Sequence, residues 1–268
     1  MTRRDLFKTA TAPILARVCR ARKPDRFNTK LKIGIQSFSL RHLPFDQMLE
    51  TVSRLGLRYF ETFEEHLPAS SSAERLERVK RRLAELDLIL MTFGVVGIDK
   101  SAPERNQQIF NFARDMELYS ISANPEPETL DSLEGFTEDS GIRIAIHPHG
   151  PEYDRYPGWK AVQKAIAGRH SAVGICMDVG HVTRAGEDPI EGLVKLRNRV
   201  YGVHLKDLDR QNRNVILGKG RLDIPRILAI LELINYRGVV SLEYEMEDGT
   251  DPLPGIRESL EYLEKILG

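Results

Sequence analysis

The sequence contains few of the residues on which several protein classes depend. Only two of its 268 residues are cysteines, Cys19 and Cys176, too few for a disulfide scaffold or a cysteine-based zinc site. No run of about 18 uncharged apolar residues occurs, so we expect no membrane-spanning helix. Long tracts of proline, glycine or serine are also absent, which predicts order over most of the chain. The 41% apolar content suits one large α/β domain.

The net charge of zero conceals an uneven distribution of charge. Residues 1–31 hold nine Lys or Arg residues against two Asp residues, which leaves a net charge of −7 on residues 32–268. A nucleic-acid-binding surface usually needs a basic face, so the acidic body argues against nucleic-acid partners.

The N-terminal segment resembles a twin-arginine export signal. Two arginines, Arg3 and Arg4, precede two large apolar residues and a lysine, and a weakly apolar stretch covers residues 9–16. The alternative is a basic leader before a cytoplasmic enzyme, because the apolar stretch is short and lacks a convincing cleavage site. Periplasmic and cytoplasmic locations both stay open. We assign residues 1–30 to a basic leader and residues 31–268 to the folded domain.

From residue 32 onward, a short apolar run, a loop and a segment of helical periodicity recur. The eight runs are Lys32–Gln36, Arg58–Glu61, Ile89–Phe93, Tyr119–Asn124, Ile142–His147, Val173–Asp178, Arg199–His204 and Gly238–Glu243. Runs that are apolar almost throughout are typical of parallel strands covered on both faces. The pattern predicts an α/β protein with a single (β/α)₈ TIM barrel. An open doubly wound sheet is the alternative, but residues 36–39 lack its phosphate-binding glycines. Helical periodicity is weakest over residues 128–140.

Four consecutive predicted strands end in residues that commonly bind metals. These residues are His147, Asp178, His204 and Glu243. Strand ends converge at one mouth of a parallel barrel, where two carboxylates without a cation would repel each other. Two imidazoles with two carboxylates suit Mn²⁺, Zn²⁺, Fe²⁺ or Co²⁺ better than Mg²⁺ or Ca²⁺. The sequence therefore predicts one divalent metal site.

Other polar residues follow the same strand ends or lie in nearby loops. The predicted catalytic residues are Glu243, His181 and Lys206. The residues predicted to contact substrate are Glu61, His149, His181, Asp207 and Lys219. Phe38 and Trp159 are candidates for an apolar wall against a sugar ring, although either could equally be a packing residue.

Several segments together resemble the xylose isomerase-like barrel superfamily, which includes the sugar phosphate isomerases and epimerases. They are Ile33–Phe38, Gly56–Glu61, Met177–His181, Gly202–Asp207, Leu217–Gly220 and Ser241–Glu243. The resemblance implies one metal held by a Glu, an Asp, a His and a Glu after strands 5 to 8, and Asp178, His204 and Glu243 match the last three. His181 matches a histidine that contacts substrate.

After strand 5 the family usually has Glu-Asn-His, whereas this chain has His147-Pro148-His149. One of the family's two acid/base carboxylates is therefore missing.

The resemblance implies a metal-dependent isomerase or epimerase of a sugar or sugar phosphate. The metal would polarise a carbonyl, and Glu243 or a loop histidine would take the proton from the neighbouring carbon. A related metal-dependent dehydratase or lyase acting on a keto-sugar stays open, because it begins with the same step. A non-catalytic sugar-binding barrel also stays open, because His147 replaces the expected Glu. A hydrolase like endonuclease IV is disfavoured, since the chain has only about one set of ligands. The expected partner is a small-molecule sugar, and a homo-oligomer stays open.

Overall fold

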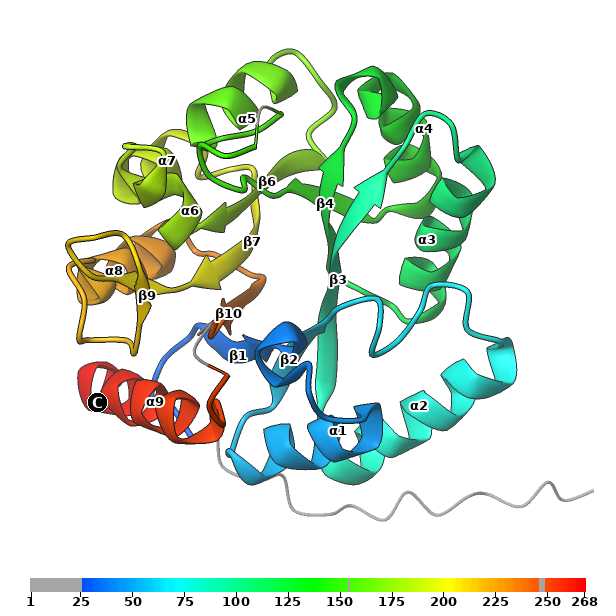
Figure 1. Cartoon of the computed structure of the whole chain (residues 1–268). Helices are drawn as coiled ribbons and strands as arrows, with labels where there is room; N and C mark the ends of the chain where they lie inside the picture. The colour runs from blue at the N-terminus through cyan, green and yellow to red at the C-terminus, as the bar shows by residue number, and fades with distance from the viewer. Residues whose placement is uncertain (1–25, 154, 246–248) are drawn as a thin grey trace, which may run out of the picture.

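Eight parallel strands close into one ring, which confirms the predicted (β/α)₈ barrel (Figure 1). We describe residues 26–153, 155–245 and 249–268 of the chain in a computed structural model. The order around the ring is β1-β10-β7-β6-β5-β4-β3-β2. The strands are β1 (Lys32–Gln36), β2 (Tyr59–Thr62), β3 (Ile89–Ile98), β4 (Ser120–Pro125), β5 (Arg143–Ile146), β6 (Val173–Asp178), β7 (Val200–Leu205) and β10 (Val239–Leu242).

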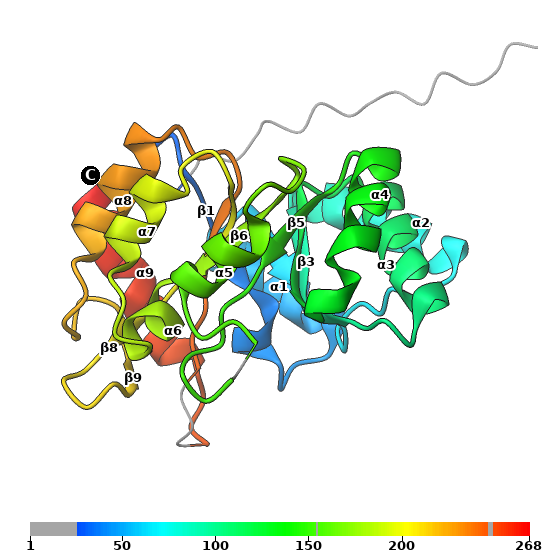
Figure 2. The same cartoon turned by 90° about the horizontal axis from the view of Figure 1, so that it is seen from above.

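Helices cover the outside of the ring, as Figures 1 and 2 show from two directions. They are α1 (Phe45–Arg54), α2 (Ala73–Leu86), α3 (Pro103–Asp115), α4 (Leu130–Ser140), α5 (Trp159–Ile166), α6 (Val179–Arg184), α7 (Pro189–Lys195), α8 (Ile224–Leu233) and α9 (Leu253–Leu267), with short 3₁₀ turns at Ser37–Leu40 and Pro127–Thr129. Among the described residues, no helix combines the length and the apolarity that crossing a bilayer would require.

Helix α4 is more regular than its weak periodicity predicted. It buries Leu130, Leu133 and Thr137, which follow one another at intervals of three and four residues and so share one face. Gly141 ends it with a left-handed φ of 70°, a conformation that glycine adopts without steric cost. Two buried leucines and a glycine cap therefore suffice where the sequence offers few apolar positions.

Two short elements beyond the eight-unit pattern lie beside the barrel mouth. Helix α6 directly follows β6, and its N-cap is Asp178, whose Oδ1 accepts a hydrogen bond from the His181 amide at 2.7 Å. After β7 the chain forms a small antiparallel pair, β8 (Asp207–Leu208) with β9 (Asn214–Val215). Both elements fix the direction of loops that follow strand ends.

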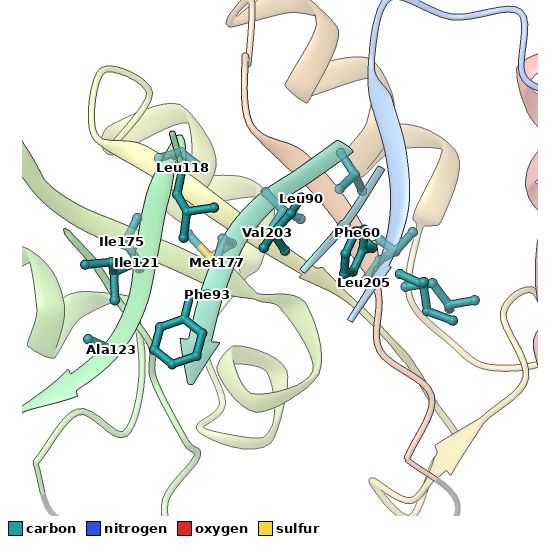
Figure 3. Packing of buried hydrophobic residues seen from close by; sticks show 14 of the residues in the cluster. Phe60, Leu90, Phe93, Leu118, Ile121, Ala123, Ile175, Met177, Val203 and Leu205 are labelled. Atoms are coloured by element: carbon teal, nitrogen blue, oxygen red, sulfur yellow. The ribbon is translucent and has the colours of Figure 1, made fainter. Parts of the chain in front are cut away.

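Side chains along the strands alternate between the helix layer and the barrel interior. On β7, Val203 and Leu205 belong to the main hydrophobic core (Figure 3), whereas His204 between them contacts Glu61 of β2. Because β7 and β2 are not neighbours in the ring, this contact crosses the interior. Small and polar side chains line that interior, namely Thr92, Ser120, Ser122, Cys176 and Ser241.

Residues just before the predicted boundary at residue 31 also pack on the barrel. Phe27 and Leu31 are both buried in the main core, and Arg26 Nη1 donates a hydrogen bond to the Leu55 carbonyl at 2.7 Å. The rest of the predicted leader, residues 1–25, lies outside the described residues, as does the proposed export motif.

We expect Phe27→Ala to lower the free energy of unfolding by about 3 kcal/mol, because a buried ring is lost and a cavity remains. Urea denaturation measures this change. Tyr153→Ala is the matched control, since 52% of the Tyr153 surface is exposed and its loss should change stability by less than about 0.5 kcal/mol. Equal effects of the two substitutions would contradict the packing of Phe27 on the barrel.

Candidate metal centre

The four predicted metal ligands lie together at the barrel mouth and are buried. One donor atom from each of His147, Asp178, His204 and Glu243 lies within 4.8 Å of every other. His204 Nδ1 is 2.7 Å from Glu243 Oε2, 3.0 Å from His147 Nε2 and 3.8 Å from Asp178 Oδ2. Ligands held at about 2.1 Å from a cation are about 3.0 Å apart at right angles and about 3.4 Å apart in a tetrahedron. The spacing of the cluster therefore suits a single divalent cation.

The surroundings of two carboxylate oxygens are compatible with the same fit. Among the described residues, the buried Asp178 Oδ2 and Glu243 Oε2 have no partner with hydrogen-bond geometry, although each lies 3.0 Å from Lys206 Nζ. Lys206 offsets part of the cost of burying these charges, and a divalent cation would offset more of it. These residues could hold a metal, and their role as ligands stays a prediction.

Backbone pairing of the strands sets the positions of the ligands. Asp178 on β6 is the register partner of His204 on β7. The His147 amide donates to the Ala123 carbonyl at 2.8 Å, and the Glu243 amide donates to the Leu205 carbonyl at 3.1 Å. Each ligand thus continues the hydrogen-bonding pattern of a strand, which holds it more firmly than a free loop would.

Lys206 places an ammonium group directly beside the cluster. Its Nζ lies 3.0 Å from Asp178 Oδ2, 3.0 Å from Glu243 Oε2 and 2.5 Å from Glu245 Oε2. Although burial alone would lower it, these carboxylates raise the pKa of Lys206. The Asp178 and Glu243 carboxyls have lowered pKa values in spite of burial, Asp178 chiefly through Lys206 and Glu243 through His204 and Lys206. Burial and the neighbouring Glu243 instead raise the pKa of the Glu245 carboxyl. Lys206 is therefore a buried cation beside two ionised carboxylates, those of Asp178 and Glu243.

A cavity of about 240 Å³ opens above the cluster. Its lining residues are Gln36, Phe38, Phe63, Glu65, Gly94, Val95, His147, His149, His181, Lys206, Glu243 and Glu245. Burial, aided by His147, lowers the pKa of His149 to about 3. Burial also lowers the pKa of His181 to about 4, although Asp178 opposes the change. Both imidazoles are neutral at pH 7 and can donate or accept hydrogen bonds.

The predicted catalytic and substrate residues divide into two groups. The cavity brings together Glu243, His181, Lys206 and His149. It does not include Glu61, Asp207 or Lys219. Phe38 is on the cavity wall, packed edge-on to Phe63 with ring centroids 5.5 Å apart, whereas Trp159 is buried away from it.

Asp207 holds a loop and does not face the cavity. Its two carboxylate oxygens accept four hydrogen bonds from the backbone amides of Leu208, Gly218, Gly220 and Leu222. A Cβ atom at Gly220 would lie 2.1 Å from Asp207 Oδ1, so only glycine permits this approach. Lys219, in the same loop, is exposed and pairs with Glu258 at 2.6 Å. The loop of residues 217–222 is thus held in place by its hydrogen bonds to Asp207.

Sequence reasoning missed several residues of the cavity wall. Gln36, Phe63, Glu65 and Glu245 line it, and the backbone at 94–95 closes one side. Glu245 lies only two residues after Glu243, yet it follows the end of a strand and no periodicity governs its direction. Phe63 lies one residue beyond β2, where the same uncertainty applies.

Comparison with known proteins places the chain among related barrels. The profile of a family described as xylose isomerase-like TIM barrel matches residues 128–266. Among curated proteins, an inosose dehydratase from Clostridium beijerinckii is 28% identical over 161 residues, which are 51% of this chain and 49% of that protein. The chain thus spans about half the length of the curated relatives it matches.

Two solved structures illustrate the shared fold. An uncharacterized protein from Parabacteroides distasonis is 28% identical, with a TM-score of 0.69 over 88% of this chain and 99% of that one. The 3-keto-D-glucoside 4-epimerase from E. coli is 20% identical, with a TM-score of 0.71 over 88% of this chain and 100% of that one. At 20% identity, the similarity to the epimerase shows a shared fold and no more.

We expect Asp178→Asn to weaken binding of Mn²⁺ or Co²⁺ strongly. Loss of a residue that only hydrogen-bonds to a metal ligand costs roughly 10–100-fold in affinity, and loss of a charged ligand should cost more. Asparagine keeps the oxygen that caps α6 but removes the charge that would face the cation. Titration of the purified chain with either metal measures the effect. Asp188→Asn is the control, because Asp188 caps α7 in the same way, through the Ile190 amide at 2.8 Å, and lies outside the cluster. Equal loss in both variants, or in neither, would refute Asp178 as a ligand.

We expect His147→Glu to shift metal preference from Zn²⁺ and Co²⁺ toward Mn²⁺ and Mg²⁺, because a third carboxylate makes the donor set harder. Competition between pairs of metals, followed by elemental analysis, gives the preference. Unchanged selectivity would count against His147 as a ligand.

Proposed function

The chain belongs to the xylose isomerase-like TIM barrel family, and we propose that it is a metal-dependent enzyme that removes a proton beside the carbonyl of a sugar or related polyhydroxy ketone. The main support is the buried cluster of two imidazoles and two carboxylates at the floor of a cavity that is also lined by His149 and His181. A bound divalent cation would polarise the carbonyl and make the neighbouring C–H more acidic.

Glu243 is the proposed general base. Its carboxylate faces the cavity and is ionised, since His204 and Lys206 hold the pKa of the carboxyl below its usual range. The neighbouring Lys206 ammonium is fixed 3.0 Å from Glu243 Oε2 and can offset negative charge that develops on the substrate oxygen. The base and the charge-stabilising group therefore lie side by side.

His149 and His181 are the proposed contacts for substrate hydroxyl groups. Their ring centroids lie 5.8 Å apart, and both residues line the cavity. Both are neutral at pH 7. His181 Nδ1 accepts from Arg184 Nη1 at 3.4 Å, which leaves the hydrogen on Nε2 for donation to substrate, whereas His149 can donate one hydrogen bond and accept another. Phe38 and Phe63 supply an apolar surface to the same cavity, which suits the less polar face of a sugar ring.

The charges of the cavity favour a substrate without a phosphate group. Among the described residues of its lining, Lys206 is the one Lys or Arg, and three carboxylates already surround it. A phosphate would therefore meet neutral histidines and carboxylates, which is unfavourable. We propose a neutral keto-sugar or polyol ketone as the substrate class.

Two outcomes of the first step remain candidates. Return of the proton gives isomerisation or epimerisation, which the resemblance implies and the fold of the epimerase neighbour supports. Loss of a hydroxyl group gives dehydration, which the inosose dehydratase relatives support. His147 in place of a glutamate favours dehydration over two-base epimerisation, because elimination needs one base and a proton donor for the departing hydroxyl.

We expect the metal-loaded chain to exchange a carbon-bound hydrogen of a suitable ketose or inosose with deuterium from D₂O. Proton NMR follows both exchange and product: loss of water identifies a dehydratase, and rearrangement without loss of water identifies an isomerase or epimerase. Glu243→Gln should slow exchange by at least about 100-fold, the usual contribution of a general base. Glu104→Gln, which alters an exposed carboxylate of α3 outside the cavity, should retain activity. Absence of exchange across a broad panel would favour a sugar-binding barrel instead.

A further inference from the structure

We infer that Glu61 is a positioning residue that fixes the orientation and tautomer of His204 for metal binding. The inference rests on the proposed metal site and assigns Glu61 a place outside the substrate cavity. It differs from the sequence-based prediction that Glu61 contacts substrate.

Glu61 lies behind His204, on the side away from the metal ligands. The Glu61 side chain is fully buried, and the register of β2 against β3 shifts between Phe60 and Glu61, an irregularity that re-aims side chains. Glu61 Oε2 lies 3.0 Å from His204 Nε2 and accepts a further hydrogen bond from Ser241 Oγ at 3.2 Å. Glu61 is not a member of the four-residue cluster.

Carboxylates flank both nitrogens of the His204 ring: Glu61 Oε2 is 3.0 Å from Nε2, and Glu243 Oε2 is 2.7 Å from Nδ1. A cation held by the four ligands would replace the hydrogen on Nδ1, and the hydrogen on Nε2 would be donated to Glu61. The lone pair is then on Nδ1, the nitrogen that faces Glu243 and His147. A carboxylate behind a ligating histidine fixes ring orientation and makes the free nitrogen a better donor.

The two histidines of the cluster differ in this respect. His147 Nε2 faces the cluster, 3.4 Å from Asp178 Oδ2, but its Nδ1 is buried and has no hydrogen-bond partner among the described residues. Only His204 therefore has a carboxylate that holds its ring in place. We expect His204 to contribute more to metal affinity because its orientation is fixed before the cation binds.

Glu61 has an incomplete set of partners, which argues against a purely structural role. Both of its hydrogen bonds converge on Oε2, whereas Oε1 is buried and unpartnered. A buried carboxylate with one unsatisfied oxygen lowers stability compared with an apolar side chain of the same volume. The contact with His204 gives such a residue a function that offsets this cost.

Metal titration of the full chain at one fixed pH tests the inference. We expect Glu61→Ala to raise the dissociation constants of Co²⁺ and Mn²⁺ by about 10–100-fold and to change the visible absorption spectrum of bound Co²⁺. Glu61→Gln should recover most of the affinity, because its amide oxygen still accepts from Nε2–H. Glu65→Ala is the control for loss of a carboxylate and should bind both metals as the wild type does.

The possible results separate the inference from the proposed function. Wild-type affinity and an unchanged spectrum in Glu61→Ala would overturn the role of Glu61 and leave the metal site intact. Glu61→Gln as weak as Glu61→Ala would also overturn it, since hydrogen-bond acceptance would then not matter. Failure of the wild type to bind metal would overturn both proposals.

A measurement on the wild type decides the question if Glu61→Ala does not fold. Nitrogen-15 chemical shifts of the His204 ring in the zinc-loaded protein distinguish the two tautomers. A hydrogen on Nε2 with zinc on Nδ1 supports the inference, and the reverse arrangement refutes it.

Discussion

The barrel mouth concentrates negative charge where little water can reach it. Asp178 and Glu243 are buried against one ammonium group, that of Lys206, and Glu245 shares it. Two charges about 3 Å apart interact by about 5 kcal/mol even at an effective dielectric constant near 20. The carboxylates can therefore stay ionised only while positive charge is held among them.

His204 can supply part of that charge in the absence of a metal. Although burial opposes it, Cys176, Glu243 and Glu61 raise the pKa of the His204 imidazole well above its usual value. A proton on Nδ1 and a cation on Nδ1 exclude each other, so uptake of a metal there releases the proton. The same ring would thus balance the carboxylates before metal binding and serve as a ligand afterwards. It is fully buried and has a carboxylate on each of two sides.

The sequence predicts the barrel and the cluster well because both depend on simple periodicities. Nearly continuous apolar runs identify the strands, and in a parallel barrel the residues that end them must converge. His147, Asp178, His204 and Glu243 each stand at such an end, so their meeting needs no knowledge of loop conformation. Because the strand backbone is regular, side-chain positions can be predicted from the sequence up to the last residue of each strand.

Residues placed by local irregularities could not be predicted in the same way. Glu61 lies one residue before the end of β2, but the register shift beside it directs its carboxylate behind His204. Asp207 follows Lys206 directly, yet a cage of backbone amides holds it away from the cavity. Bulges and loops depend on contacts between distant segments, such as β2 with β7, which no local pattern encodes.

The exchange of a glutamate for His147 is best understood through the charge of the mouth. With a glutamate there, the cluster would carry one more negative charge, and the ammonium of Lys206 would have a further carboxylate nearby. A neutral imidazole keeps a donor atom at the same strand end but reduces the charge that must be compensated. In the proposed reaction Glu243 is the carboxylate of the cluster that accepts a proton from substrate, and Glu65 and Glu245 are further carboxylates on the cavity wall. The histidine thus lowers the negative charge of the cluster while the architecture of the barrel stays the same.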